Sequence, residues 1–165
     1  MQKQKKHINL GGVNGTGKGI VDTNSKDYKA LQKAILAHYE QSSPEEKIKN
    51  NLVSLRFQMD TYLTTTTPKT IISSGEFLKQ HINALGINNK AFADYINIKA
   101  SNLSAILKGK RKISIDLAYK LGKAFDINPN IWIFIQNKNE LLNIHKTQKE
   151  NYQHYKLADL LKICI

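Results

Sequence analysis

Residues 11–19, Gly-Gly-Val-Asn-Gly-Thr-Gly-Lys-Gly, have a composition and spacing that suit phosphate binding. Counted from Gly12, they form the pattern G-x-x-x-x-G-K-G, whereas the phosphate-binding loop of nucleotide hydrolases ends in Ser or Thr. In that loop backbone N–H groups surround the phosphates, the lysine neutralises charge, and the final hydroxyl binds Mg²⁺. Gly19 occupies the hydroxyl position here and offers no such ligand.

The residues around this loop do not fit a nucleotide site. Such a loop needs a strand before it and a helix directly after it, because the phosphate is bound at the helix N-terminus. Only His-Ile-Asn-Leu at residues 7–10 precedes it, and no helical spacing begins before Ser25. We therefore predict that the protein is not an enzyme and uses no cofactor, and that residues 1–24 form a flexible Gly- and Lys-rich tail.

Histidine and cysteine give no other chemistry. The five histidines lack the spacing of metal ligands, and Cys164 is the single cysteine, so we expect no metal site and no internal disulfide. The longest apolar run, at residues 131–135, is far below the roughly 20 residues that span a bilayer. These features favour a cytoplasmic protein without a membrane partner.

The charge of the chain indicates a polyanionic binding partner. Twenty-five Lys and Arg against thirteen Asp and Glu give a net charge of +12, which favours binding to DNA, RNA or an anionic membrane surface. Residues 99–112 contain five basic residues and no acidic residue. These are Lys99, Lys108, Lys110, Arg111 and Lys112.

The elements that would position these cations are helical throughout. Apolar spacings and cap residues predict helices over residues 26–40, 44–63, 75–85, 89–96, 100–108 and 115–125, another from Asn128-Pro129, and a short amphipathic helix near the C-terminus. No segment has the alternation of a β-strand, so we predict an all-α protein. The expected organisation is a tail (1–24), a helical hairpin (25–63), a linker (64–72), a helical domain (73–145) and a second tail (146–165).

The helix at 44–63 has an apolar stripe with heptad spacing. Its members are Ile48, Leu52, Leu55, Met59 and Tyr62. Two interpretations are open: the stripe packs against the preceding helix, or it forms a dimer seam.

The helices at 89–96 and 100–108 have the features of a helix–turn–helix. Asn97 lies between them and tolerates the positive φ that a tight turn requires, and Ala93 is small enough for close approach of the helices. Leu103 and Ile106 form the apolar side of the second helix. Its other side carries small or hydrogen-bonding residues that suit a DNA major groove, namely Ala100, Ser101, Asn102, Ser104, Ala105 and Lys108.

Three segments together resemble the Xre or λ-repressor-like helix–turn–helix family, and most closely the HigA-type antitoxins, also called plasmid maintenance antidotes. They are Gly75-Glu-Phe-Leu-Lys79, Leu-Ser-Ala-Ile-Leu-Lys-Gly-Lys-Arg-Lys-Ile-Ser at 103–114, and Ile-Asn-Pro-Asn-Ile-Trp-Ile-Phe-Ile-Gln at 127–136. The resemblance implies a five-helix DNA-binding domain. It also implies a homodimer on a pseudo-palindromic double-stranded operator, and a repressor that autoregulates its promoter and neutralises a small RNase-type toxin.

The match departs from the family at three places. Asn88 and Asn89 stand where the family often has glutamine, Lys99 replaces the usual Ser or Thr cap, and Ala105 replaces a common basic residue. The predicted DNA-binding residues are Asn88, Asn89, Lys90, Lys99, Ala100, Ser101, Asn102, Ser104, Ala105, Lys108, Lys110, Arg111 and Lys112.

Alternatives remain at this point. The chain could be a regulator without a toxin partner, or a degenerate helix–turn–helix module that binds only protein. Residues 1–63 and 146–165 are the expected toxin contacts, if a toxin exists. Trp132 is expected in the core, with a dimer interface as the other interpretation.

Overall fold

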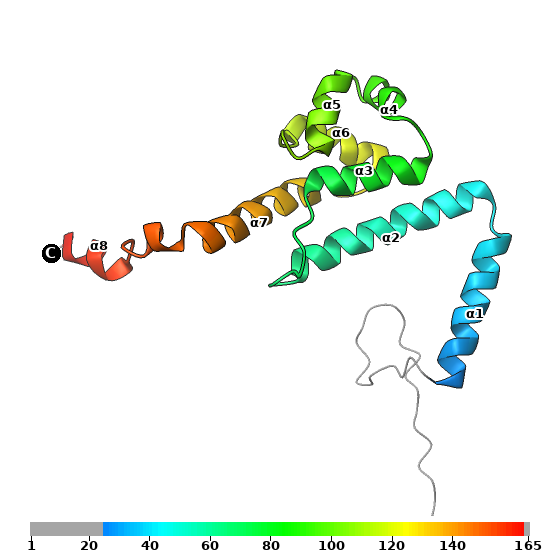
Figure 1. The fold of residues 1–165 in the computed structure, drawn as a ribbon, viewed down its shortest axis with the longest axis horizontal. Coiled ribbons are helices and arrows are strands. Elements are labelled where there is room, and N and C mark those ends of the chain that lie inside the picture. Colours follow the sequence, from blue (N-terminus) through cyan, green and yellow to red (C-terminus); the bar gives the residue numbers. More distant parts are fainter. Residues whose placement is uncertain (1–24, 164–165) are drawn as a thin grey trace, which may run out of the picture. The chain divides into compact units, whose positions relative to one another are not determined.

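The computed structural model describes residues 25–163, and the Gly-rich residues 11–19 lie outside this range. All α-helices and the one 3₁₀ helix of the described range are shown in Figure 1, and no strand occurs within it. The elements are α1 (Lys26–Gln41), α2 (Pro44–Thr64), α3 (Ser74–Leu85), α4 (Asn89–Tyr95), α5 (Ala100–Leu107), α6 (Ile115–Phe125), α7 (Asn130–Thr147), η1 (Lys149–Tyr152) and α8 (Leu157–Ile163). The predicted all-α class is confirmed.

Side-chain caps explain where several helices begin. Ser25, Asn88 and Ser114 each accept a hydrogen bond from the backbone N–H three residues later, which satisfies a donor that the helix itself leaves unpaired. Helix α3 begins one residue earlier than predicted, because Ser73 rather than Ser74 caps it, with 3.0 Å from Ser73 Oγ to the Glu76 N–H. Ser74 is instead buried inside the helix.

The core lies among α3, α4, α5, α6 and α7. Its largest fully buried side chains include Trp132, Phe77, Phe92, Leu103 and Leu121, so the prediction that Trp132 belongs to the core is confirmed. Helix α3 contacts both α5 and α7 and therefore lies between the element that carries the predicted recognition face and the element that carries the tryptophan.

Helix α2 also contributes to this core. Met59 is fully buried, and the ring of Tyr62 lies edge-on to Phe77 with 5.8 Å between ring centroids. The Tyr62 hydroxyl donates to Asn139 Oδ1 of α7 at 2.5 Å. The C-terminal half of the predicted stripe is therefore buried within this unit, and neither the preceding helix nor a second copy is needed to cover it.

Helix α1 belongs to a separate compact unit and is described by itself. None of its residues is buried, and its large apolar side chains, including Leu31, Ile35 and Leu36, are exposed. Among the described helices, none combines the length and apolar character needed to cross a bilayer.

Candidate nucleic-acid interface

The turn between α4 and α5 is a Schellman motif, in which two backbone N–H groups bond back to carbonyls of the preceding helix. Asn97 has a φ of 55°, as predicted. Its N–H donates to the Asp94 carbonyl at 3.2 Å, and the Ile98 N–H donates to the Ala93 carbonyl at 2.9 Å. Ala93 is fully buried, and α4 and α5 contact each other.

One side of α5 is buried in the core and the other side is exposed to solvent. Leu103 and Ile106 lie in the core, whereas Ala100, Ser101 and Lys108 are exposed and Asn102, Ser104 and Ala105 are partly exposed. Lys99 precedes the helix and provides no side-chain cap, so the cap that the family pattern would supply is lost here. The exposed face thus has small and hydrogen-bonding side chains, as predicted.

A second Schellman motif follows α5. Gly109 has a φ of 68°, its N–H donates to the Ile106 carbonyl at 2.9 Å, and the Lys110 N–H donates to the Ala105 carbonyl at 2.8 Å. Glycine suits this position because a positive φ is strained for residues with a Cβ. The turn reverses the chain, and Arg111 Nη1 donates to Asn102 Oδ1 on α5 at 2.9 Å.

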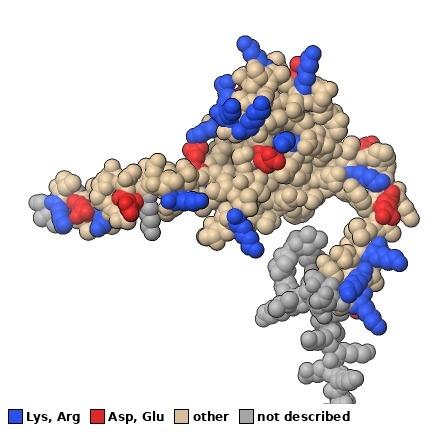
Figure 2. Space-filling model, viewed as in Figure 1, with Lys and Arg blue, Asp and Glu red and all other residues tan. Residues whose placement is uncertain are grey.

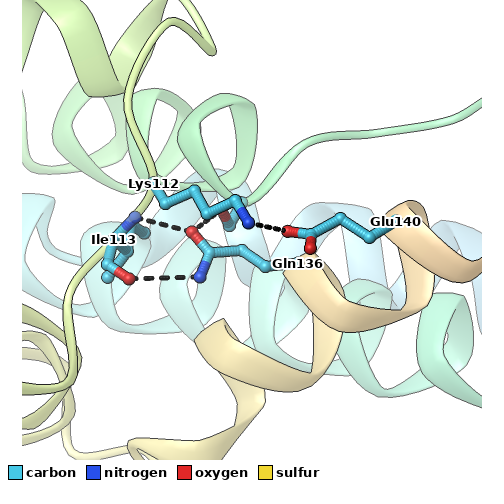
Figure 3. A network of polar contacts seen from close by, with 5 residues as sticks. Lys112, Ile113, Gln136 and Glu140 are labelled. Carbon is cyan, nitrogen blue, oxygen red and sulfur yellow. Dashed lines mark hydrogen bonds and ion pairs between the residues drawn. The ribbon is translucent and has the colours of Figure 1, made fainter.

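The basic residues of this region differ in their surroundings. In Figure 2, Lys and Arg side chains gather over α5 and the turn that follows it. Within residues 25–163, the ammonium groups of Lys99, Lys108 and Lys110 form no ion pair, and all three side chains are exposed. Lys112, by contrast, lies 2.7 Å from the carboxylate of Glu140 on α7 (Figure 3).

Gln136 holds the end of this turn against the core (Figure 3). Its Oε1 accepts the Ile113 N–H at 2.6 Å and the Ser74 hydroxyl at 3.2 Å, and its Nε2 donates to the Ile113 carbonyl at 3.1 Å. One carboxamide therefore links α7 to α3 and to the segment that carries the cations. Sequence reasoning missed this role, although an amide four residues after a buried tryptophan on one helix face was a usable signal.

The three predicted contacts at the start of α4 are exposed. Asn88 Oδ1 accepts the Ala91 N–H at 2.8 Å and so serves as the cap of α4. Its amide nitrogen has no hydrogen-bond partner within the described residues, and Asn89 and Lys90 extend the exposed surface along the first turn.

His81 of α3 is a buried titratable group in the core. Its Nδ1 donates to the Phe77 carbonyl at 2.8 Å, and its ring lies edge-on to Phe125 and Trp132 at 4.8 and 5.3 Å between centroids. Burial, the larger effect, lowers the pKa of His81, whereas the hydrogen bond to Phe77 raises it. The ring is therefore neutral at pH 7, with its proton on Nδ1 because a carbonyl can only accept.

Two short helices joined by a tight turn, with a second helix that exposes a polar face, define a helix–turn–helix protein. Residues 78–132 match the family model described as helix-turn-helix. The match includes α4, α5 and α6 completely, together with most of α3 and the start of α7.

Similar proteins come from several bacteria. Virulence-associated protein A' of Dichelobacter nodosus is 37% identical over 71 residues, which are 42% of this chain and 62% of that protein. The crystal structure of a protein of Nostoc punctiforme, described as an antidote of a plasmid maintenance system, is 30% identical with a TM-score of 0.46, over 50% of this chain and 90% of that one. The antitoxin HigA of Pseudomonas aeruginosa, solved with the higBA promoter, is 25% identical with a TM-score of 0.49, over 53% and 96% of the two chains.

Proposed function

We propose that this protein binds double-stranded DNA in a sequence-specific manner and represses transcription, with α5 inserted in the major groove. The observation that carries the proposal is the exposed face of α5, which has small and hydrogen-bonding side chains. It lies next to Lys99, Lys108 and Lys110, whose ammonium groups form no ion pair in the described part of the chain. A major groove about 12 Å wide admits a helix of this kind, and the cations suit the phosphates at its edges.

The proposed roles follow from position on the helix. Ser101, Asn102 and Ser104 contact base edges, because residues near the start of a recognition helix reach deepest into the groove. Ala100 and Ala105 offer apolar contact to thymine methyl groups. Lys99, Lys108 and Lys110, with Asn88, Asn89 and Lys90 at the start of α4, contact phosphates. Lys112 contributes less than these cations, because Glu140 already neutralises it.

We further propose that two copies bind as a homodimer. Their recognition helices then enter successive major grooves, about 34 Å apart, on a pseudo-palindromic site. This deduction rests on the way helix–turn–helix proteins bind DNA.

Binding of the full chain to a selected site and to random duplex tests the proposal. Ser101→Ala should weaken binding to the selected site by about 1–3 kcal/mol per lost base contact and leave random DNA unchanged. Lys110→Ala should weaken binding to the selected site and to random DNA alike. It should also reduce the slope of log K against log salt concentration by about one. Lys112→Ala is the matched control and should change the slope less. Equal losses on both DNAs for Ser101→Ala would contradict base readout.

A finer proposal is that the protein is the antitoxin of a toxin–antitoxin operon. The three segments at 75–79, 103–114 and 127–136 support it through their resemblance to HigA-type antitoxins. Co-expression with the product of the adjacent gene tests this proposal. Growth arrest by that product alone, with rescue by this chain, is the expected result. No arrest would favour a regulator without a toxin, and no DNA binding at all would favour a degenerate module that binds only protein.

A further inference from the structure

The hydrogen bond between Arg111 and Asn102 fixes the orientation of an amide on the proposed recognition face. Arg111 Nη1 lies 2.9 Å from Asn102 Oδ1. A guanidinium has five N–H donors and no acceptor, so only the oxygen of the carboxamide can face it. The amide nitrogen of Asn102 therefore points away from Arg111.

Backbone geometry holds Arg111 in this place. The Lys110 and Arg111 N–H groups both donate to the Ala105 carbonyl, at 2.8 and 3.2 Å, so the chain after Gly109 runs back alongside α5. The side chain of Arg111 then extends toward the first turn of the helix, where Asn102 lies. Within the described residues, Asn102 Nδ2 has no hydrogen-bond partner of its own, which leaves both of its N–H donors for a ligand.

An amide held in this way distinguishes bases. A free asparagine pairs with adenine through its oxygen and its nitrogen together, at N6 and N7. When the oxygen accepts from Arg111, the amide cannot rotate to place its oxygen and its nitrogen together against one base, so its two N–H donors are the groups presented to the DNA. Guanine presents two acceptors in the major groove, O6 and N7, and matches both N–H donors of the amide. Cytosine presents a donor, adenine presents one donor and one acceptor, and thymine presents the single acceptor O4 beside its methyl group.

We propose that Arg111 is a positioning residue that makes Asn102 a hydrogen-bond donor, and that the base facing Asn102 in the DNA site is therefore a guanine. This inference rests on the proposed DNA-binding function and adds to it the chemistry of one base contact. Arg111 retains guanidinium donors for a phosphate, so its two roles must be separated by experiment.

Selection of duplexes from a random pool by the full chain and its variants provides the test. Asn102→Ala identifies the base pair that Asn102 contacts, since preference there alone is lost. Arg111→Ala should shift that position from guanine toward adenine by about tenfold in relative affinity, because the released amide can rotate. Asn102→Asp keeps an acceptor for Arg111 but offers no donor, and should shift the preference to cytosine.

Lys110→Ala is the matched control, because it removes the same charge from the neighbouring residue without contact to Asn102. It should lower affinity for all sequences equally and leave the guanine preference intact. The inference is overturned if Arg111→Ala and Lys110→Ala have the same effect, or if the wild-type chain prefers adenine at that position. A wild-type chain that selects no sequence would refute the proposed function itself. Thermal melting confirms that each variant is folded.

Discussion

At the scale of single residues, Gly75 allows α3 to pack closely against α5, the proposed recognition helix. A Cβ built on Gly75 would lie 2.0 Å from the Ile106 carbonyl oxygen of α5, far closer than any real contact between these atoms. The obstructing atom belongs to the backbone of α5, so no side-chain rotation can relieve the clash. The close crossing of α3 and α5 therefore depends on glycine at this position.

Gly75→Ala should lower the free energy of unfolding by about 2–3 kcal/mol, even though alanine favours a helix by up to about 1 kcal/mol over glycine. Gly86→Ala is the control: Gly86 has a φ of 69° with open space around it, and strain alone should cost about 1 kcal/mol. Urea unfolding of both variants measures the difference. A smaller loss for Gly75→Ala than for Gly86→Ala would show that the helices can separate at little cost.

His81 gives the fold a pH dependence. Because burial holds the pKa of His81 below its ordinary value of about 6.5, the unfolded chain binds a proton at a higher pH than the folded chain. The contribution of neutral, buried His81 to the free energy of unfolding is complete above about pH 6.5. It declines as the pH falls through that value toward the lowered pKa. Urea unfolding between pH 8 and pH 5 should show this decline, and His81→Leu should flatten it. The same slope in both proteins would assign the effect to other groups.

At the scale of elements, α7 organises the domain through its side chains. Gln136 and Glu140 reach the turn after α5, and Lys138 Nζ donates to the carbonyls of Tyr62, Leu63 and Thr65 at the end of α2. Asn139 Nδ2 donates to the Ile72 carbonyl at 2.9 Å, which fixes the segment between α2 and α3. Helix α7 thus connects the core, the end of α2 and the basic turn after α5.

Gln136→Ala should destabilise the protein by about 1–3 kcal/mol, because the Ile113 N–H and carbonyl both lose their partner. It should also weaken selective DNA binding, since the turn that carries Arg111 loses its hydrogen bonds to Gln136. Asn137→Ala on the exposed side of the same helix is the control and should stay within about 0.5 kcal/mol of the wild type. Thermal melting and DNA binding, measured together, check both effects. Equal stability of the two variants would exclude the proposed role of Gln136.

Local signals in the sequence predicted much of this element arrangement. Caps and apolar spacing located the helices, and the turn chemistry of asparagine located the positive φ at Asn97. The contacts of Lys112 with Glu140 and of Tyr62 with Asn139 join residues that are far apart in the chain, and periodicity identifies a buried face without identifying what covers it. The same limit applied to the stripe of α2, whose buried half packs on the helix–turn–helix core.

At the scale of the whole molecule, part of the excess of basic residues is concentrated at one place on the surface. The net charge of +12 is a property of the full chain, yet Lys99, Lys108 and Lys110, which are exposed and form no ion pair with any residue of 25–163, lie beside the polar face of α5. A positive field of this kind attracts a polyanion such as the proposed DNA partner. Fold, charge and recognition face therefore support the same proposed function.

Nuclease protection of the DNA upstream of the protein's own gene tests the central proposal most directly. The full chain should protect two half-sites whose centres are about one helical turn apart, roughly 10 base pairs. Ser101→Ala should lose protection at concentrations where the wild-type chain protects fully. Uniform coverage of the fragment, or equal protection by both proteins, would contradict specific recognition through α5.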